Sequence, residues 1–439
     1  MKKILILGAG LVCRPGARYL LEQGYAVTIA SRTLAKAEEI VQGFDNGTAR
    51  QLMVEDKEGL AALVRENDIV VSLLPFVHHP DVARTCLAHN KPMATSSYVS
   101  DEMRAFDGEA KSKNLILLNE IGIDPGVDHM SAMRIIDEVH ARGGKIRHFY
   151  SLCGGLPAPD DNDNPFGYKF SWSPRGVVLA SRNSARYLEN GEVVNIKGED
   201  LFLNKRIETV DPLGDFEVYP NRDSLPYKEI YGLKEAETVM RGTYRNVGWC
   251  DTLKKIVDLG LVDETPTAYT KDATFRALMA ELVGADENED LAAATARKLG
   301  LEKEHFVIDN LVWLGLFDAQ PLPDAGSKLD ILSEQLLRKL QYKDGEKDMI
   351  ILRHRFEVEN ADGSGHTITS TLIDYGIPHG DSSMARTVSL PLAVGVCLMA
   401  EGKIDLTGVQ IPTCKELYQP VLDGIAELRI EVVEERIAH

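Results

Sequence analysis

The chain has 439 residues, more than one domain usually holds, so two or three packed units are expected. Hydrophobic residues make up 44% and charged residues 26% of the sequence, which excludes a disordered or fibrous protein. A net charge of -18, and the lack of an apolar run approaching about 20 residues, argue against nucleic acid and membrane partners.

From residue 3 to about 120, short Val/Ile/Leu runs alternate with stretches of helical periodicity, at 34–42 and 57–66 among others. The strand candidates are "KILILG", "YAVTIA", "ARQLMVE", "DIVVSLLP", "KPMATSS" and "NLILLNEIG". This alternation predicts an α/β fold with a Rossmann-type doubly wound parallel sheet. The start, "MKKILILGAG", is too short an apolar run for a signal peptide, so we interpret it as the first strand of a cytoplasmic protein.

After "GIDPGVDH" an amphipathic helix is expected over about 127–142, followed by longer strands with polar alternation. These strand candidates are "GKIRHFYSLC", "YKFSW", "EVVNIKG", "DFEVYP", "DMIILRHRFEVEN" and "HTITSTLIDYG". "ENADGSG" predicts a hairpin, because its Asp-Gly step supplies a left-handed turn residue. An antiparallel or mixed sheet, interrupted by a helical insertion, follows from this pattern.

The predicted division has three parts, and the apolar helix at about 382–400 is expected to pack on the first of them. The parts are a nucleotide-binding domain (1–123 and 391–439), a second α/β domain (124–233 and 343–390) and a helical insertion (234–342). The six cysteines show no CxxC pair and no Cys/His spacing typical of zinc sites, so we expect reduced thiols and no metal.

A glycine-rich turn follows the first predicted strand and precedes a helix, which is the context that a dinucleotide fingerprint requires. Gly8 would make the tight turn, and Gly10 would let backbone N–H groups approach a pyrophosphate. Cys13 occupies the place of the third glycine, which implies a different packing of the helix, with Pro15 in its first turn. Leu11 and Val12 complete the predicted cofactor loop.

The end of the second predicted strand lacks the carboxylate that NAD enzymes place on the ribose 2′-hydroxyl. Ser31, Arg32 and Thr33 stand there instead. A carboxylate about 4 Å from a 2′-phosphate would repel it by a few kcal/mol, whereas a guanidinium can grip the phosphate or stack on the adenine. The sequence therefore predicts NADP(H) over NAD(H). The alternative is a solvated Arg32 that caps the next helix.

The carboxyl ends of the fourth and fifth predicted strands carry further candidates, since open parallel sheets bind ligands at that edge. Leu74 and Pro75 are expected under the nicotinamide half of the cofactor, and Thr95, Ser97 and Tyr98 are candidates for the site. His78 and His79 invite a catalytic interpretation, but histidines beside a proline at a helix start are more often capping or surface residues.

Five segments in order resemble the saccharopine dehydrogenase (L-glutamate-forming) family, and the resemblance runs nearly end to end. They are "EIGIDPGVDHM", "CGGLPAPDDNDNPFGYKFSWSPRG", "YPNRDSLPY", "RGTYR" and "EKDMIILRH". The resemblance implies a Rossmann domain, a second α/β domain with a mixed sheet, and a helical insertion. It also implies an NADP-dependent oxidoreductase of lysine metabolism that acts on CH–NH donors, with an NAD-dependent form left open. The implied reaction condenses L-glutamate with 2-aminoadipate 6-semialdehyde and reduces the imine to saccharopine.

Saccharopine carries three carboxylates, so an acidic protein must supply cations locally. Arg222, in a Pro-bounded loop, is our first choice for a carboxylate clamp, followed by Lys169 and Arg245. By resemblance, the pocket is lined by Ser97, Tyr98, Asp124, Arg222 and Thr243, with Phe170 and Trp172 as its apolar wall. Cys153 and Gly154 are expected at its edge, where Cys153 is more readily a pocket-lining thiol than a nucleophile.

Proton transfer is required, and Asp124 and Tyr98 are the predicted catalytic residues. Asp124 could equally serve as an N-cap of the following helix. The predicted cofactor contacts beyond those above are Gly122, Pro125, Gly126 and Val127.

Two alternatives stay open. One is a reductive amination like that of carboxynorspermidine synthase, which joins a diamine to aspartate semialdehyde; the other is a non-catalytic NADP(H)-sensing protein. The acidic composition is compatible with a homodimer without indicating one.

Overall fold

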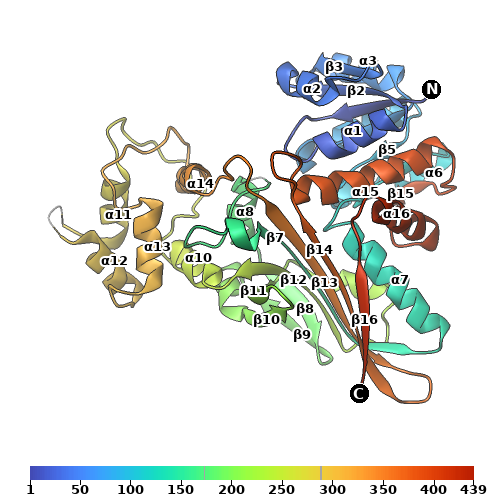
Figure 1. Ribbon diagram of the computed structural model, residues 1–439. Coiled ribbons are helices and arrows are strands. Elements are labelled where there is room, and N and C mark those ends of the chain that lie inside the picture. The colour runs from blue at the N-terminus through green and yellow to red at the C-terminus, as the bar shows by residue number, and fades with distance from the viewer. Residues whose placement is uncertain (173, 287–288) are drawn as a thin grey trace. The chain divides into compact units, whose positions relative to one another are not determined.

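The computed structural model describes residues 1–172, 174–286 and 289–439 and forms two compact units (Figure 1). The first unit comprises Met1–Ile146 and Leu352–His439, and the second comprises Arg147–Ile351. Residues 124–146 and 352–390 thus group with the nucleotide-binding sheet, whereas we expected them in a second domain. The three-part domain division stays a prediction.

The first unit contains a sheet whose seven strands all pair in parallel, in the order β15-β6-β5-β4-β1-β2-β3. The strands are β1 (Lys3–Leu7), β2 (Ala26–Ser31), β3 (Gly47–Gln51), β4 (Ile69–Ser72), β5 (Met93–Ala94), β6 (Ile116–Leu118) and β15 (Gly408–Gln410). The six predicted strands are confirmed, and β15 was not expected. The order reverses at β1 and β4, which is where such sheets bind dinucleotides.

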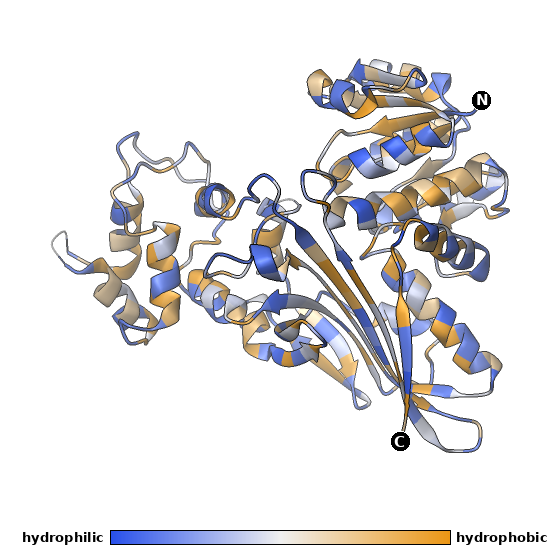
Figure 2. Ribbon diagram, viewed as in Figure 1, coloured by the Kyte–Doolittle hydropathy of each residue, from blue (hydrophilic) through white to orange (hydrophobic). Residues whose placement is uncertain are grey.

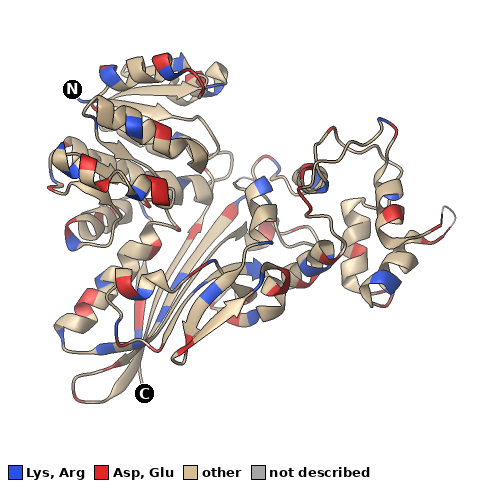
Figure 3. Cartoon of the chain, turned by 180° about the vertical axis from the view of Figure 1, so that it is seen from behind, with Lys and Arg blue, Asp and Glu red and all other residues tan. Residues whose placement is uncertain are grey.

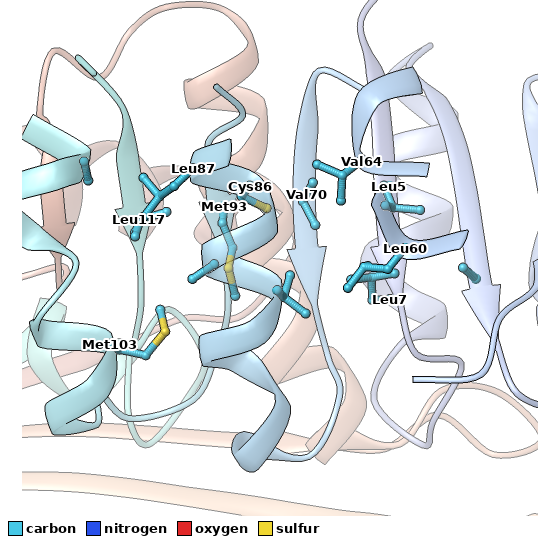
Figure 4. Close-up of a cluster of buried hydrophobic side chains, with 14 residues drawn as sticks. Leu5, Leu7, Leu60, Val64, Val70, Cys86, Leu87, Met93, Met103 and Leu117 are labelled. Atoms are coloured by element: carbon cyan, nitrogen blue, oxygen red, sulfur yellow. The ribbon is translucent and has the colours of Figure 1, made fainter. Parts of the chain in front are cut away.

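Helices cover both faces of this sheet, which explains why its strands read as near-continuous apolar runs. The helices of the unit are α1 (Arg14–Glu22), α2 (Leu34–Val41), α3 (Lys57–Glu66), α4 (His79–Ala88), α5 (Asp101–Arg104), α6 (Asp107–Ser112), α7 (Val127–Ala141), α15 (Ser383–Ala400) and α16 (Lys415–Glu427), with the 3-10 turn η1 (Phe76–His78). Figure 4 shows Leu60 and Val64 of α3 beside Leu5 and Leu7 of β1 in the buried core.

Helix α15 packs beside α1, as predicted, where the Gly16 amide donates a hydrogen bond of 2.9 Å to Ser389 Oγ. It is mostly hydrophobic along its length (Figure 2). Among the described residues it is the one helix long and apolar enough to cross a membrane. However, 72% of that stretch is buried inside the protein, as in the core helix of a soluble protein.

The first unit also contains β14 (Gly365–Tyr375) and β16 (Val433–Ala438), which pair in antiparallel fashion. Strand β13 (Asp348–Glu359) neighbours β14 and begins in the second unit. The predicted hairpin between them is confirmed: the Asn360 amide donates to Ser364 O at 2.8 Å, and Gly363 has a φ of 86°.

The second unit has a mixed sheet, as predicted, because β12 pairs in parallel with β7 and antiparallel with β11. Its strands are β7 (Lys145–Pro157, which begins in the first unit), β8 (Ala185–Glu189), β9 (Glu192–Ile196), β10 (Arg206–Val210), β11 (Gly214–Pro220) and β12 (Thr238–Asn246). Its helices are α8 (Pro174–Ala180), α9 (Pro226–Ile230), α10 (Trp249–Asp258), α11 (Phe275–Val283), α12 (Leu291–Leu299), α13 (Phe306–Leu314) and α14 (Lys328–Lys339), with 3-10 turns η2 (Pro159–Asp161) and η3 (Gly198–Asn204).

Two predictions for this unit are wrong. The helical segment does not begin at 234, because residues 238–246 form β12, whose Thr, Val and Tyr side chains favour strand. The segment 168–172 is no strand either. Its backbone bonds to loops: Asn164 Nδ2 donates to Tyr168 O at 3.0 Å, and the Phe170 amide donates to Leu340 O at 2.9 Å.

Candidate functional site

The predicted nucleotide loop runs from the end of β1 into α1. Gly8 has a φ of 106°, and a Cβ there would lie 3.0 Å from Leu73 O, so the turn requires glycine. A Cβ on Gly10 would meet no atom within 4 Å, which leaves its backbone open to a ligand. Leu11 is 69% exposed and Val12 is half-buried at the mouth of the loop. This geometry fits a pyrophosphate at the N-terminus of α1.

The missing third glycine of the fingerprint has a substitute that sequence reasoning did not identify. Cys13 is buried, and burial raises the pKa of its thiol to about 12, so it is a packing residue. Gly16 permits the close approach instead, since a Cβ on it would lie 2.5 Å from Ser389 O. The glycine therefore serves packing of α1 against α15.

The end of β2 carries the three polar side chains that were predicted to contact a cofactor ribose. Arg32 is exposed, and among the described residues its guanidinium has no carboxylate at ion-pair distance, although its carbonyl accepts from Gln51 Nε2 at 3.1 Å. Thr33 is the N-cap of α2 but makes no side-chain cap hydrogen bond, and Ser31 Oγ accepts from the Thr33 amide at 3.3 Å. Arg32 is therefore not the helix cap, and these groups fit a 2′-phosphate. Figure 3 shows acidic and basic residues interspersed over the helices, so such a cation must act locally.

The predicted contacts at the nicotinamide end divide into accessible and buried residues. Pro75 is exposed and Leu74 half-buried, as a cofactor contact requires. Gly122, Pro125 and Gly126 are buried in a tight loop, in which the Gly122 amide donates to Pro125 O at 2.9 Å. The side chain of Val127 is fully buried. Its predicted contact with the cofactor stays a prediction.

Tyr98 and Asp124 meet in the first unit, where Tyr98 Oη donates to Asp124 Oδ1 at 2.7 Å. Asp124 does not cap α7, because the N-cap is Gly126 and the Gly126 amide donates to Asp128 Oδ1 at 2.5 Å. Both side chains are half-buried, which leaves the pair accessible to a ligand. The alternative of a helix cap is thus not supported for Asp124, and its role in proton transfer stays a prediction.

A buried carboxylate that sequence reasoning missed supports this pair. Glu120 is 6% exposed and accepts from the Val99 amide, next to Tyr98, at 2.9 Å. Its other oxygen lies 2.8 Å from Nε2 of the fully buried His129. The Glu120–His129 contact thus ties the Tyr98 loop to α7.

His79 is neither a cap nor a surface residue, contrary to expectation. It is 2% exposed, and its ring lies among Ser72, Ser97 and Thr95, which is itself 1% exposed. Burial, followed by the charge of His78, lowers the pKa of His79 to about 4. His78 is half-buried, without a cap bond to α4.

In the second unit, β7 and β12 bring two predicted pocket residues together. Cys153 and Thr243 are register partners across the parallel pair. Cys153 is 9% exposed and Thr243 half-buried. Gly154 has no room for a side chain, because a Cβ would lie 2.7 Å from Tyr244 O. The backbone of this glycine is thus in close contact with the neighbouring strand of the sheet.

Arg245, also on β12, is 5% exposed and lies among aromatic rings. Its guanidinium carbon is 5.0 Å from the ring centre of Tyr168, 5.5 Å from that of Trp249 and 5.9 Å from that of Tyr219. Nη1 donates to Tyr244 O at 2.8 Å, but Nε has no hydrogen-bond partner. No carboxylate within the described residues forms an ion pair with it. A buried, uncompensated cation is costly unless an anion joins it.

Lys169 differs, because two carboxylates already neutralise it. It is 2% exposed, and its ammonium lies 2.7 Å from Glu346 Oε2 and 2.8 Å from Asp163 Oδ1. This geometry argues against the predicted role as a substrate clamp and favours fixing the loop. Phe170 stacks edge-on with Tyr168 at 5.3 Å, as an apolar wall would, and Trp172 is half-buried beside them.

Arg222 follows β11 in a left-handed conformation, with a φ of 56°, and is exposed. Its carbonyl accepts from the Arg186 amide at 2.8 Å, and Arg186 pairs with Asp223 at 2.6 Å. These bonds order the loop that presents Arg222. No group of described residues has the side chains to hold a metal ion.

Comparison with known proteins gives a consistent result over the whole chain. Residues 4–118 match the saccharopine dehydrogenase NADP binding domain, and residues 122–430 match the saccharopine dehydrogenase C-terminal domain. The chain is 41% identical to saccharopine dehydrogenase [NADP(+), L-glutamate-forming] of Schizosaccharomyces pombe, over 100% of this chain and 99% of that protein. It is 38% identical to bovine mitochondrial alpha-aminoadipic semialdehyde synthase, over 97% of this chain but 46% of the larger protein.

A solved structure agrees. The apo saccharopine dehydrogenase (L-Glu forming) of Saccharomyces cerevisiae superposes with a TM-score of 0.92 at 38% identity, and each chain is covered completely. These matches span both units and include the nucleotide-binding sheet. The chain belongs to the saccharopine dehydrogenase family, with residues 4–118 as its NADP binding domain.

Proposed function

We propose that this protein catalyses the NADP(H)-dependent, reversible reduction of the imine of L-glutamate and L-2-aminoadipate 6-semialdehyde to saccharopine, in lysine metabolism. The observation that carries the proposal is the full-length similarity to L-glutamate-forming enzymes. In the oxidative direction, saccharopine, NADP⁺ and water give L-glutamate, the semialdehyde, NADPH and a proton.

The uncompensated cation Arg245 supports a substrate rich in carboxylates. Its guanidinium is buried and has one vacant donor at Nε, so a ligand carboxylate would both neutralise and satisfy it. Arg222, exposed on an ordered loop, is a second candidate clamp. Lys169 is omitted because Glu346 and Asp163 already pair with it.

NADPH, when bound, supplies the hydride for the imine carbon. In the proposal, the α1 N-terminus holds its pyrophosphate, and Ser31, Arg32 and Thr33 hold its 2′-phosphate. The lack of a carboxylate partner for Arg32 within the described residues favours NADP over NAD.

Proton transfer is assigned to the Tyr98–Asp124 pair. The 2.7 Å bond from Tyr98 Oη to Asp124 makes the phenol a directed donor, and an ionised Asp124 can take up a proton when the carbinolamine forms or collapses. Cys153 has no role in this scheme, because reduction of an imine by hydride needs no covalent step.

The test is a spectrophotometric assay of NADPH oxidation. L-glutamate with aminoadipate semialdehyde should support turnover, whereas a diamine with aspartate semialdehyde should not. Turnover with the second pair alone would favour a carboxynorspermidine synthase activity. NADPH binding without turnover by either pair would favour a sensor. A cytoplasmic location and a homodimer stay predictions.

A further inference from the structure

His79 lies where the proposed scheme gives it no role, yet it contacts two residues of the candidate site. It is the first residue of α4, at the carboxyl edge of the parallel sheet, between the ends of β4 and β5. Nδ1 lies 2.9 Å from Ser72 Oγ, and Nε2 lies 2.7 Å from Ser97 Oγ and 3.3 Å from Thr95 Oγ1. Each ring nitrogen therefore has a hydroxyl partner.

The surroundings decide which nitrogen carries the proton. Ser72 is fully buried, and among the described residues His79 is the sole hydrogen-bond partner of its hydroxyl. If Nδ1 carried the proton, Ser72 could only accept, and its own buried proton would be left without an acceptor, at the cost of its desolvation. If Nε2 carries the proton, Ser72 donates to Nδ1 and this cost disappears. The Nε2–H tautomer is therefore favoured.

Thr95 does not reverse this choice. Nε2 of a neutral ring carries either one lone pair or one proton, so it can form one strong hydrogen bond. Ser97 Oγ, at 2.7 Å, forms that bond in preference to Thr95 Oγ1, at 3.3 Å. Thr95 Oγ1 also accepts a weak bond from the Ser97 amide at 3.3 Å. Its hydroxyl proton is thus weakly placed in either tautomer, so only Ser72 discriminates between them.

The tautomer of His79 determines how the Ser97 hydroxyl can form hydrogen bonds. With Nε2–H donating to Ser97 Oγ, one of the two lone pairs of that hydroxyl is occupied by the protein, and its proton points elsewhere. Ser97 is half-buried, and His79 is the one side-chain partner of its hydroxyl within the described residues. Its proton is thus available to an acceptor outside the protein, such as a carboxylate.

We propose that His79 is a positioning residue. Ser72 Oγ–H donates to His79 Nδ1, and His79 Nε2–H donates to Ser97 Oγ. These two bonds fix the Ser97 hydroxyl as a hydrogen-bond donor to a carboxylate of the substrate. This inference rests on the proposed function, because Ser97 is taken as part of the saccharopine pocket.

The tautomer can be observed without turnover. In the ¹⁵N-histidine-labelled protein, the signals of His79 are those that a His79→Gln variant loses from the set of 11 histidines. A protonated, pyrrole-type nitrogen at Nε2 and a pyridine-type nitrogen at Nδ1 are expected. A protonated Nδ1, or two protonated nitrogens at pH 7, would overturn the inference.

The coupling of Ser72 to Ser97 through His79 can be measured with small substitutions that leave α4 intact. Ser97→Ala should raise the KM for saccharopine about tenfold or more, the range for a bond to a charged group. Ser72→Ala frees the tautomer and should raise that KM about threefold, while NADPH binding changes less. In Ser72→Ala/Ser97→Ala the KM should equal that of Ser97→Ala, because both changes act on one hydroxyl.

His89→Gln, at the other end of α4, is the matched control and should leave the KM unchanged. Additive effects of Ser72→Ala and Ser97→Ala would contradict a relay through His79. A parent protein without saccharopine turnover would overturn the proposed function and, with it, the ligand assigned to Ser97. The wrong tautomer in an active enzyme would overturn this inference alone.

Discussion

Replacement of Arg32 by alanine tests the origin of the cofactor preference. The guanidinium is exposed, and among the described residues no carboxylate holds it, so no internal ion pair competes with a 2′-phosphate. Hydrogen bonds to charged groups contribute about 1.5–3 kcal/mol, and solvent exposure places this one near the lower end. The Kd for NADPH should therefore rise roughly 10–30-fold, since 1.4 kcal/mol corresponds to a factor of about ten.

The assay is a fluorescence titration of the purified variant with NADPH and, separately, with NADH. NADH binding should stay within about twofold, because NADH lacks the phosphate that Arg32 is proposed to contact. Arg65→Ala, an exposed arginine at the end of α3 and at the opposite edge of the sheet, is the control and should affect neither titration. Equal losses of affinity for NADPH and NADH in Arg32→Ala would refute the phosphate role. Arg32 would then contribute only a general electrostatic attraction to both cofactors.

Three further changes probe the charges of the site. Arg245→Met should raise the saccharopine KM about 10–100-fold. It should leave the free energy of unfolding unchanged or higher, because it removes an uncompensated buried cation. A large loss of stability in denaturant titration would mean that Arg245 is structural. Lys169→Met should lower the free energy of unfolding by about 1.5–3 kcal/mol, since Glu346 loses its 2.7 Å bond and, among the described residues, keeps only Lys343, whose ammonium lies 3.5 Å away. A variant as stable as the parent would contradict the pairing. Burial lowers the pKa of His79 to about 4 in the folded protein, against an ordinary value of 6.5. As the pH falls, the unfolded chain therefore binds a proton at His79 before the folded chain does. The free energy of unfolding should fall between pH 6.5 and pH 4, by about 2 kcal/mol at pH 5. His79→Gln should remove that part of the pH dependence, and an unchanged slope would show that the pKa of His79 is the same in the folded and the unfolded chain.

The nucleotide-binding half could be predicted from the sequence because its signals are local. Buried parallel strands produce continuous apolar runs, and the turn after β1 must be glycine, so strand positions and the loop at Gly8 follow from neighbouring residues. The absent carboxylate at Arg32 is likewise read from one strand end.

The features that were missed depend on contacts between distant segments. Gly16 replaces the third fingerprint glycine because α15, more than 360 residues later, presses against α1. The roles of Glu120 and His79 arise only when strand ends and helices meet at the sheet edge.

One missed feature, strand β8, did have a local signal. Asn190 and Gly191 both have positive φ in the two-residue turn from β8 to β9, and the Asn-Gly step could have predicted that hairpin.

Lys169 illustrates a different limit of sequence reasoning. A lysine beside aromatic residues predicts a cation available to a ligand, but Glu346, 177 residues later in the chain, pairs with it, as does the nearby Asp163. Whether a cation is available depends on the carboxylates that the fold brings to it. By the same criterion Arg245, which has none among the described residues, gains weight as a ligand site.

Product analysis of saccharopine oxidation tests the central claim most directly. The purified protein is incubated with saccharopine and NADP⁺, and the amino acids formed are identified by mass spectrometry alongside the absorbance of NADPH. Equal amounts of L-glutamate, aminoadipate semialdehyde and NADPH are predicted. Release of lysine and 2-oxoglutarate, or no NADPH at all, would contradict the account.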